Sequence, residues 1–79
     1  MLKIKDNVDL KELEKFGFEE VDGEYYYNFI PYTIYEYSYL CIDYKREILT
    51  GYVVYEHIDK MTDLLFDLIQ AGLVEKVGE

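Results

Sequence analysis

The chain has 79 residues, enough for one domain over residues 1–79, and its 51% hydrophobic and 18% aromatic content is too high for intrinsic disorder. Its formal net charge is −9, from 17 acidic and 8 basic residues, which disfavours direct binding to nucleic acid or to an anionic membrane. Two interpretations of this charge remain: a surface for a basic protein partner, or the solubility of a small domain.

The remaining bulk features indicate a cytoplasmic protein. The single cysteine, Cys41, has no second cysteine with which to form an internal disulfide, which is typical of a reducing compartment. The N-terminus lacks the apolar run of a signal peptide, and no apolar segment approaches the about 20 residues that a membrane helix needs.

The first third of the chain predicts a short strand and then a short helix. Residues 2–5 alternate apolar and basic side chains, which favours a strand. Asp9 lies three residues before Glu12, the spacing of a capping box, and Gly17 is typical of the left-handed position that ends a helix. We therefore expect a helix over residues 10–16.

The middle of the chain predicts β-structure, and all ten tyrosines lie between Tyr25 and Tyr55. Asp22-Gly23 predicts a type I′ hairpin turn. That register places Phe18 opposite Tyr27, Glu20 opposite Tyr25, Glu19 opposite Tyr26 and Val21 opposite Glu24. Pro31 ends the second strand of this hairpin, because proline has no N–H to donate to a ladder.

A second hairpin is expected over residues 35–55, with its turn at residues 43–46. Alternation along its first strand gives two faces. One face carries Tyr35, Tyr37, Tyr39 and Cys41. The other carries Glu36, Ser38, Leu40 and Ile42. Gly51 thins one face of the returning strand or marks a bulge.

The last third predicts a second helix that begins between Asp59 and Thr62 and ends at Gly72, followed by a strand over residues 73–77. Apolar residues recur at steps of three and four in this helix, so one side of it belongs to a core. The resulting order is β-α-β-β-β-β-α-β. We expect an α+β domain with an antiparallel sheet of four to six strands and two short helices packed on one face.

The sequence favours no catalytic, metal or cofactor site. Cys41 lies in an apolar strand where thiols behave as small hydrophobes, and no nucleophile signature surrounds His57. His57, Asp59 and Asp63 are close in sequence but lack the spacing of a metal motif. The five glycines are scattered singly, so no phosphate-binding loop is present. We expect a protein without enzyme activity.

Recognition of a protein partner is the remaining candidate function. Asp59, Asp63 and Asp67 recur every four residues and align on one side of the second helix, about 6 Å apart along its axis. That is close to the phosphate spacing of a single strand, so this side of the helix could imitate nucleic acid to a basic groove. The candidate partner-binding residues are Glu56, Asp59, Asp63, Asp67, Tyr35, Tyr37 and Tyr39.

Each of these features also has a purely structural interpretation. Acids at the start of a helix are favoured by its dipole, and acids further along can simply be solvated. Tyrosines on the strands either anchor an interface or fill a core. An alternative function is a homo-oligomeric interaction module whose tyrosine strands form the interface.

Two segments carry a resemblance. Residues 8–18, read as Val-Asp-Leu-Lys-Glu-Leu-Glu-Lys-Phe-Gly-Phe, and residues 63–77, read as Asp-Leu-Leu-Phe-Asp-Leu-Ile-Gln-Ala-Gly-Leu-Val-Glu-Lys-Val, resemble small proteins encoded by phages and prophages of low-GC Gram-positive bacteria. The resemblance covers about a third of the chain and transfers no activity to any residue. It implies an accessory protein in a bacterial host cell, similar to anti-CRISPR and other anti-defence inhibitors that occlude a nucleic-acid groove.

Overall fold

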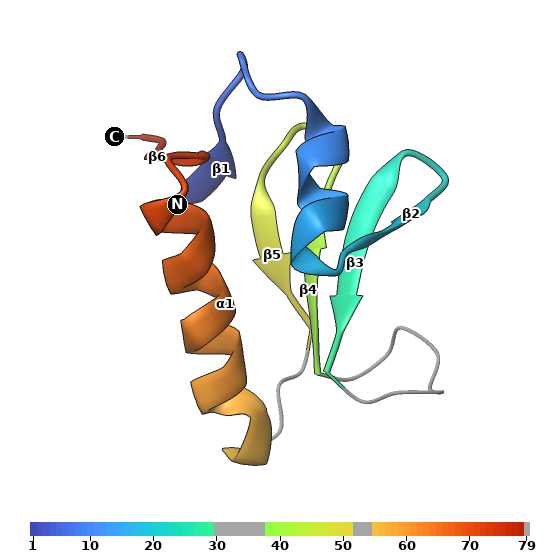
Figure 1. Cartoon of the computed structure of the whole chain (residues 1–79), viewed down its shortest axis with the longest axis vertical. Coiled ribbons are helices and arrows are strands. Elements are labelled where there is room, and N and C mark those ends of the chain that lie inside the picture. Colours follow the sequence, from blue (N-terminus) through green and yellow to red (C-terminus); the bar gives the residue numbers. More distant parts are fainter. Residues whose placement is uncertain (30–37, 52–54, 79) are drawn as a thin grey trace.

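The structure, a computed structural model, describes residues 1–29, 38–51 and 55–78. The elements of these residues follow the order β1 (Leu2–Ile4), η1 (Leu10–Phe16), β2 (Glu19–Val21), β3 (Glu24–Asn28), β4 (Tyr39–Ile42), β5 (Ile48–Thr50), η2 (Tyr55–His57), α1 (Ile58–Gln70) and β6 (Val74–Lys76). Figure 1 shows this arrangement. The predicted α+β class and the order of strands and helices are confirmed. None of the helices in the described ranges has the length and apolar character needed to cross a membrane.

The six described strands form two antiparallel sheets and not a single one. The larger sheet has the order β2-β3-β4-β5, and β1 pairs with β6 in a separate two-stranded sheet near the C-terminal end of α1 (Figure 1). The two sheets touch at two backbone contacts. The Ile4 N–H donates to the Arg46 carbonyl at 2.8 Å, and the backbones of Lys3 and Glu47 form an isolated antiparallel β-bridge. The chain ends therefore pair with each other and join the larger sheet at the β4–β5 turn.

The core lies between one face of the larger sheet and the two helices. Leu40 and Ile42 alternate onto this face of β4 and are fully buried, as the predicted faces require. Leu13 from η1 and Leu68 from α1 are also fully buried in the same cluster. The cover of this face therefore comes from both helices.

The first helix has the predicted extent but is a 3-10 helix and not an α-helix. The Asp9 carboxylate accepts a hydrogen bond from the Lys11 N–H at 3.0 Å, so the cap closes one residue earlier than the capping box predicts. Gly17 has φ 95°, and the Phe18 N–H donates to the Leu13 carbonyl at 3.3 Å. This is the helix ending that the glycine predicts.

The Asp22-Gly23 hairpin matches the prediction in turn and register. Both turn residues have positive φ, 52° and 86°, as a type I′ turn requires. Tyr25 pairs with Glu20, and Tyr26 pairs with Glu19. The register is set locally because the turn leaves no other pairing.

The second hairpin is shorter in the described residues than the prediction. Its strands are β4 and β5, with register Cys41 to Leu49. The predictions for residues 30–37, including the strand end at Pro31, and for residues 52–54 lie outside the described residues.

The second helix, α1, begins at Ile58, one residue before the predicted range. His57 occupies the N-cap position without a side-chain hydrogen bond, so neither Asp59 nor Thr62 caps the helix. The preceding 3-10 turn, η2, leads directly into α1, which explains the earlier start. At the other end Leu73 N–H donates to the Leu68 carbonyl at 3.2 Å, and the predicted closure after Gly72 is confirmed.

Candidate protein-binding surface on the long helix

Three carboxylates form an exposed row along α1. Asp59, Asp63 and Asp67 are all exposed, and the helix is continuous through the three positions. Successive members are about 6 Å apart along the axis. In the described part of the chain none of the three forms an ion pair. We call these three residues the acidic row.

The position of the acidic row follows from the burial of the leucine side of α1. Leu64 and Leu68 are buried against the sheet, with Met61 and Leu65 half-buried beside them. Four residues advance a helix by slightly more than one turn, so aspartates spaced by four remain on one side while the leucines turn inward. The apolar periodicity of the sequence therefore determines where the acids lie.

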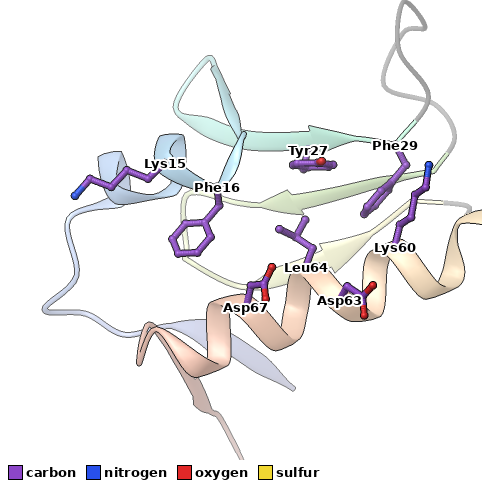
Figure 2. Close-up of a pocket in the computed structure, with 8 residues that line it drawn as sticks. All are labelled: Lys15, Phe16, Tyr27, Phe29, Lys60, Asp63, Leu64 and Asp67. Carbon is purple, nitrogen blue, oxygen red and sulfur yellow. The ribbon is translucent and has the colours of Figure 1, made fainter.

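Two members of the acidic row border a pocket of about 520 Å³ between η1 and α1. Figure 2 shows Asp63 and Asp67 on α1 with Phe16 on η1 across from them. The remaining lining residues are Lys15, Tyr27, Phe29, Lys60 and Leu64. The pocket therefore has an aromatic wall and both signs of charge at its rim.

The aromatic wall is built by neighbouring rings on the core face of the sheet. Tyr27 in β3 and Phe29, directly after that strand, have ring centroids 5.0 Å apart. The rings of Phe18 and Tyr27 pack in a T-shaped arrangement, with their centroids 5.7 Å apart. A Cβ at Gly17 would lie 2.9 Å from the Tyr27 ring, so the glycine allows η1 to end directly over that ring.

The pocket's other lining residues were not predicted from the sequence. Lys15 and Lys60 are 45 positions apart in the chain and line the same pocket only because η1 and α1 pack on the same sheet face. No local pattern relates these two lysines to each other or to Tyr27. Only the four-residue spacing of Asp63 and Asp67 is visible in the sequence.

The predicted site residues do not form one surface. Glu56 is exposed in η2, one turn before the acidic row. Tyr39 is two residues before Cys41 in β4, so the two side chains share one face of the sheet. That face points away from the helices, because Leu40 between them faces the core. Tyr35 and Tyr37 lie outside the described residues. The described members therefore divide between the α1 side and the opposite sheet face.

That opposite face carries a tyrosine pair over the cysteine. Tyr26 and Tyr39 have ring centroids 5.5 Å apart, and the Tyr26 hydroxyl donates to Glu24 at 3.1 Å. Burial, followed by hydrogen bonding with Cys41, raises the pKa of Tyr26. Burial also raises the pKa of the Cys41 thiol, which is only 5% exposed. The cysteine is therefore a protonated packing residue at neutral pH.

The fold brings Ser38 and His57 together. His57 Nδ1 is 3.1 Å from Ser38 Oγ. Ser38 is fully buried. The contact ties the start of β4 to the start of α1. Across the described ranges, no group of three or more histidine, cysteine or acidic side chains is arranged to hold a metal ion.

Comparison with known proteins gives no relative. No family model matches the chain, and neither the curated proteins nor the solved structures contain a significant match.

Proposed function

We propose that the protein acts by binding a basic protein partner through the acidic row of α1, and that it is not an enzyme. The observation that supports this most is the exposure of Asp59, Asp63 and Asp67 on a continuous helix without an ion pair among the described residues. A net charge of −9 adds a long-range attraction for a positively charged partner.

Helix stability explains only one member of the acidic row. The dipole favours negative charge in the first turn, and Asp59 is the acid that occupies it. Asp63 is in the middle of α1, and Asp67 is near the C-terminal end, where the dipole disfavours a negative charge. Asp63 and Asp67 therefore gain no stabilisation from the helix dipole, which supports a role in binding.

The spacing of the acidic row supports a partner that normally binds nucleic acid. A rise of about 6 Å per four residues is close to the phosphate spacing of an extended single strand, so a groove of lysines and arginines that tracks such a strand also fits the row. The resemblance to phage-encoded proteins extends the proposal to an anti-defence inhibitor, similar to anti-CRISPR proteins, in the cytoplasm of a bacterial host cell.

The test is capture of a partner from a bacterial host lysate on immobilised protein, followed by measurement of its affinity. We expect binding that weakens about tenfold or more when salt rises from 50 to 200 mM, because exposed charges are screened over about 10 Å at 0.1 M. The triple variant Asp59→Asn/Asp63→Asn/Asp67→Asn should lose most of the affinity. A short single-stranded oligonucleotide should displace the wild-type protein from its partner.

A matched variant separates the acidic row from net charge. Glu14→Gln/Asp22→Asn/Glu75→Gln removes three exposed acids from other elements, so its formal charge equals that of the α1 variant. We expect it to keep the wild-type affinity within about twofold. Equal weakening by both triple variants would show that only total charge matters, and an unchanged affinity in the α1 variant would exclude the proposal.

A further inference from the structure

The helix that carries the acidic row also has an exposed apolar side. Ile58, Phe66 and Ile69 are 41%, 56% and 48% exposed. Three of the seven exposed large hydrophobic residues in the described ranges thus lie on this one helix. We call these three residues the apolar ridge.

The members of the apolar ridge lie along one side of α1. Ile58 and Phe66 are eight residues apart, with the exposed Thr62 midway between them. Ile58, Thr62 and Phe66 therefore form a row along the helix. Ile69 follows Phe66 by three residues and adjoins the half-buried Leu65, four residues before it. The ridge therefore extends from the exposed surface to the edge of the core side of α1.

The apolar ridge and the acidic row are neighbouring strips. Each acid of the row follows a member of the Ile58–Thr62–Phe66 row by one residue, a rotation of about 100° around the helix. Phe66 also follows Asp63 by three residues, the separation at which helical side chains are neighbours. A partner that covers the ridge consequently places its flank against the carboxylates.

We propose that the apolar ridge docks an amphipathic helix of the partner whose apolar side is bordered by lysine or arginine. This inference rests on the proposed function, because it specifies how the basic partner is held. The 13-residue α1 offers about 20 Å of helix for such a contact. Apolar residues of the partner cover Phe66 and Ile69 while its basic flank meets Asp59 and Asp63.

Charge complementarity favours this occupant over a second copy of the chain. A second copy brings another net charge of −9 to the same surface, and its own apolar ridge is bordered by carboxylates. Like charges brought together at an interface oppose association. A basic amphipathic helix satisfies both the apolar ridge and the acidic row.

The probe is a synthetic peptide of about 14 residues composed of leucine and lysine. Its leucines recur at steps of three and four residues, so that they form one side of a helix and the lysines form the other. A second peptide has the same composition with its leucines spread around the helix. Affinities for the whole protein are measured by fluorescence anisotropy at peptide concentrations where each peptide is monomeric. Circular dichroism confirms that every protein variant is folded.

We expect the amphipathic peptide to bind more tightly than the spread peptide. Phe66→Ser/Ile69→Ser should weaken binding of the amphipathic peptide about tenfold or more, and leave the spread peptide unchanged. The control Tyr44→Ser removes an exposed aromatic side chain from the β4–β5 turn and should stay within about twofold of wild type.

The outcomes separate this inference from the proposed function. If the Asp59→Asn/Asp63→Asn/Asp67→Asn variant loses affinity and Phe66→Ser/Ile69→Ser does not, the acidic row binds and the docking inference is wrong. If both peptides bind the wild type equally, the inference is also wrong. Self-association in sedimentation, abolished by Phe66→Ser/Ile69→Ser, would assign the ridge to a second copy and overturn it as well.

Discussion

Gly51 lies against the ring of Tyr39, so closely that a Cβ atom at this position would overlap the ring. The Gly51 N–H also donates to the Tyr39 carbonyl at 3.1 Å, which holds the backbone in place beneath the ring. The sequence identifies Gly51 as a thinned position or a bulge on the second hairpin. The structure supplies the reason, which is the space taken by one aromatic side chain.

At this scale we predict that Gly51→Ala lowers the free energy of unfolding by about 1–3 kcal/mol, the usual cost of overpacking. In a Tyr39→Ala background the same substitution should cost much less, because the ring is gone. Urea unfolding of the four proteins completes this double-mutant cycle. An equal cost in both backgrounds would mean that backbone conformation, and not the ring, requires the glycine.

At the scale of the element, α1 has two apolar sides with different roles. Leu68 is fully buried, whereas Phe66, two residues earlier, is 56% exposed. The sequence places both in one apolar-rich helix, and its three- and four-residue steps assign Met61, Leu64, Leu65, Leu68 and Ile69 to the core side. The assignment is wrong for Ile69, which is 48% exposed. Periodicity predicts which side is buried, but it does not predict that Phe66 and Ile69 form an exposed ridge.

We expect Leu68→Ala to destabilise the protein by about 2–5 kcal/mol, because it leaves a cavity in the core. Phe66→Ala should change stability by no more than about 0.5 kcal/mol, although it removes more side-chain atoms. Chemical denaturation with far-UV circular dichroism as the readout measures both. Comparable losses in the two variants would show that Phe66 is packed and not available to a partner.

At the scale of the whole molecule, Arg46 connects parts that are far apart in the chain. Its guanidinium Nη1 donates to the Lys5 carbonyl at 2.8 Å and to the Val8 carbonyl at 2.7 Å. Its own carbonyl accepts from the Ile4 N–H at 2.8 Å. The β4–β5 turn is thereby attached to β1 and to the segment that leads into η1.

Loss of this connection should weaken the whole fold. Arg46→Ala is expected to lower the free energy of unfolding by about 2 kcal/mol, since two partly buried carbonyls lose a charged donor. The neighbouring Lys45→Ala removes the same charge from an exposed side chain and should be nearly neutral. Thermal unfolding of both variants tests this. An equal loss of stability in Arg46→Ala and Lys45→Ala would show that the change in net charge, and not the lost hydrogen bonds, destabilises the fold.

The sequence alone determined the features that depend on near neighbours. The Asp22-Gly23 turn, the glycine endings at Gly17 and Gly72, and the alternating faces of β3 and β4 all follow from contacts within a few residues. The exposure of Asp59, Asp63 and Asp67 follows from the same helical periodicity. The turn and the two helix endings are predictable because the hydrogen bonds that define them close between residues only a few positions apart in the chain.

Features that depend on distant partners follow from the packing of the whole fold. The pairing of β1 with β6 joins the two ends of the chain, and Arg46 reaches carbonyls about 40 positions away. The pocket between η1 and α1 exists because both helices pack on one sheet face. These contacts depend on which surfaces are still free to pack after the local structure has formed. Local sequence patterns therefore do not predict them. The apolar ridge beside the acidic row is such a remaining surface.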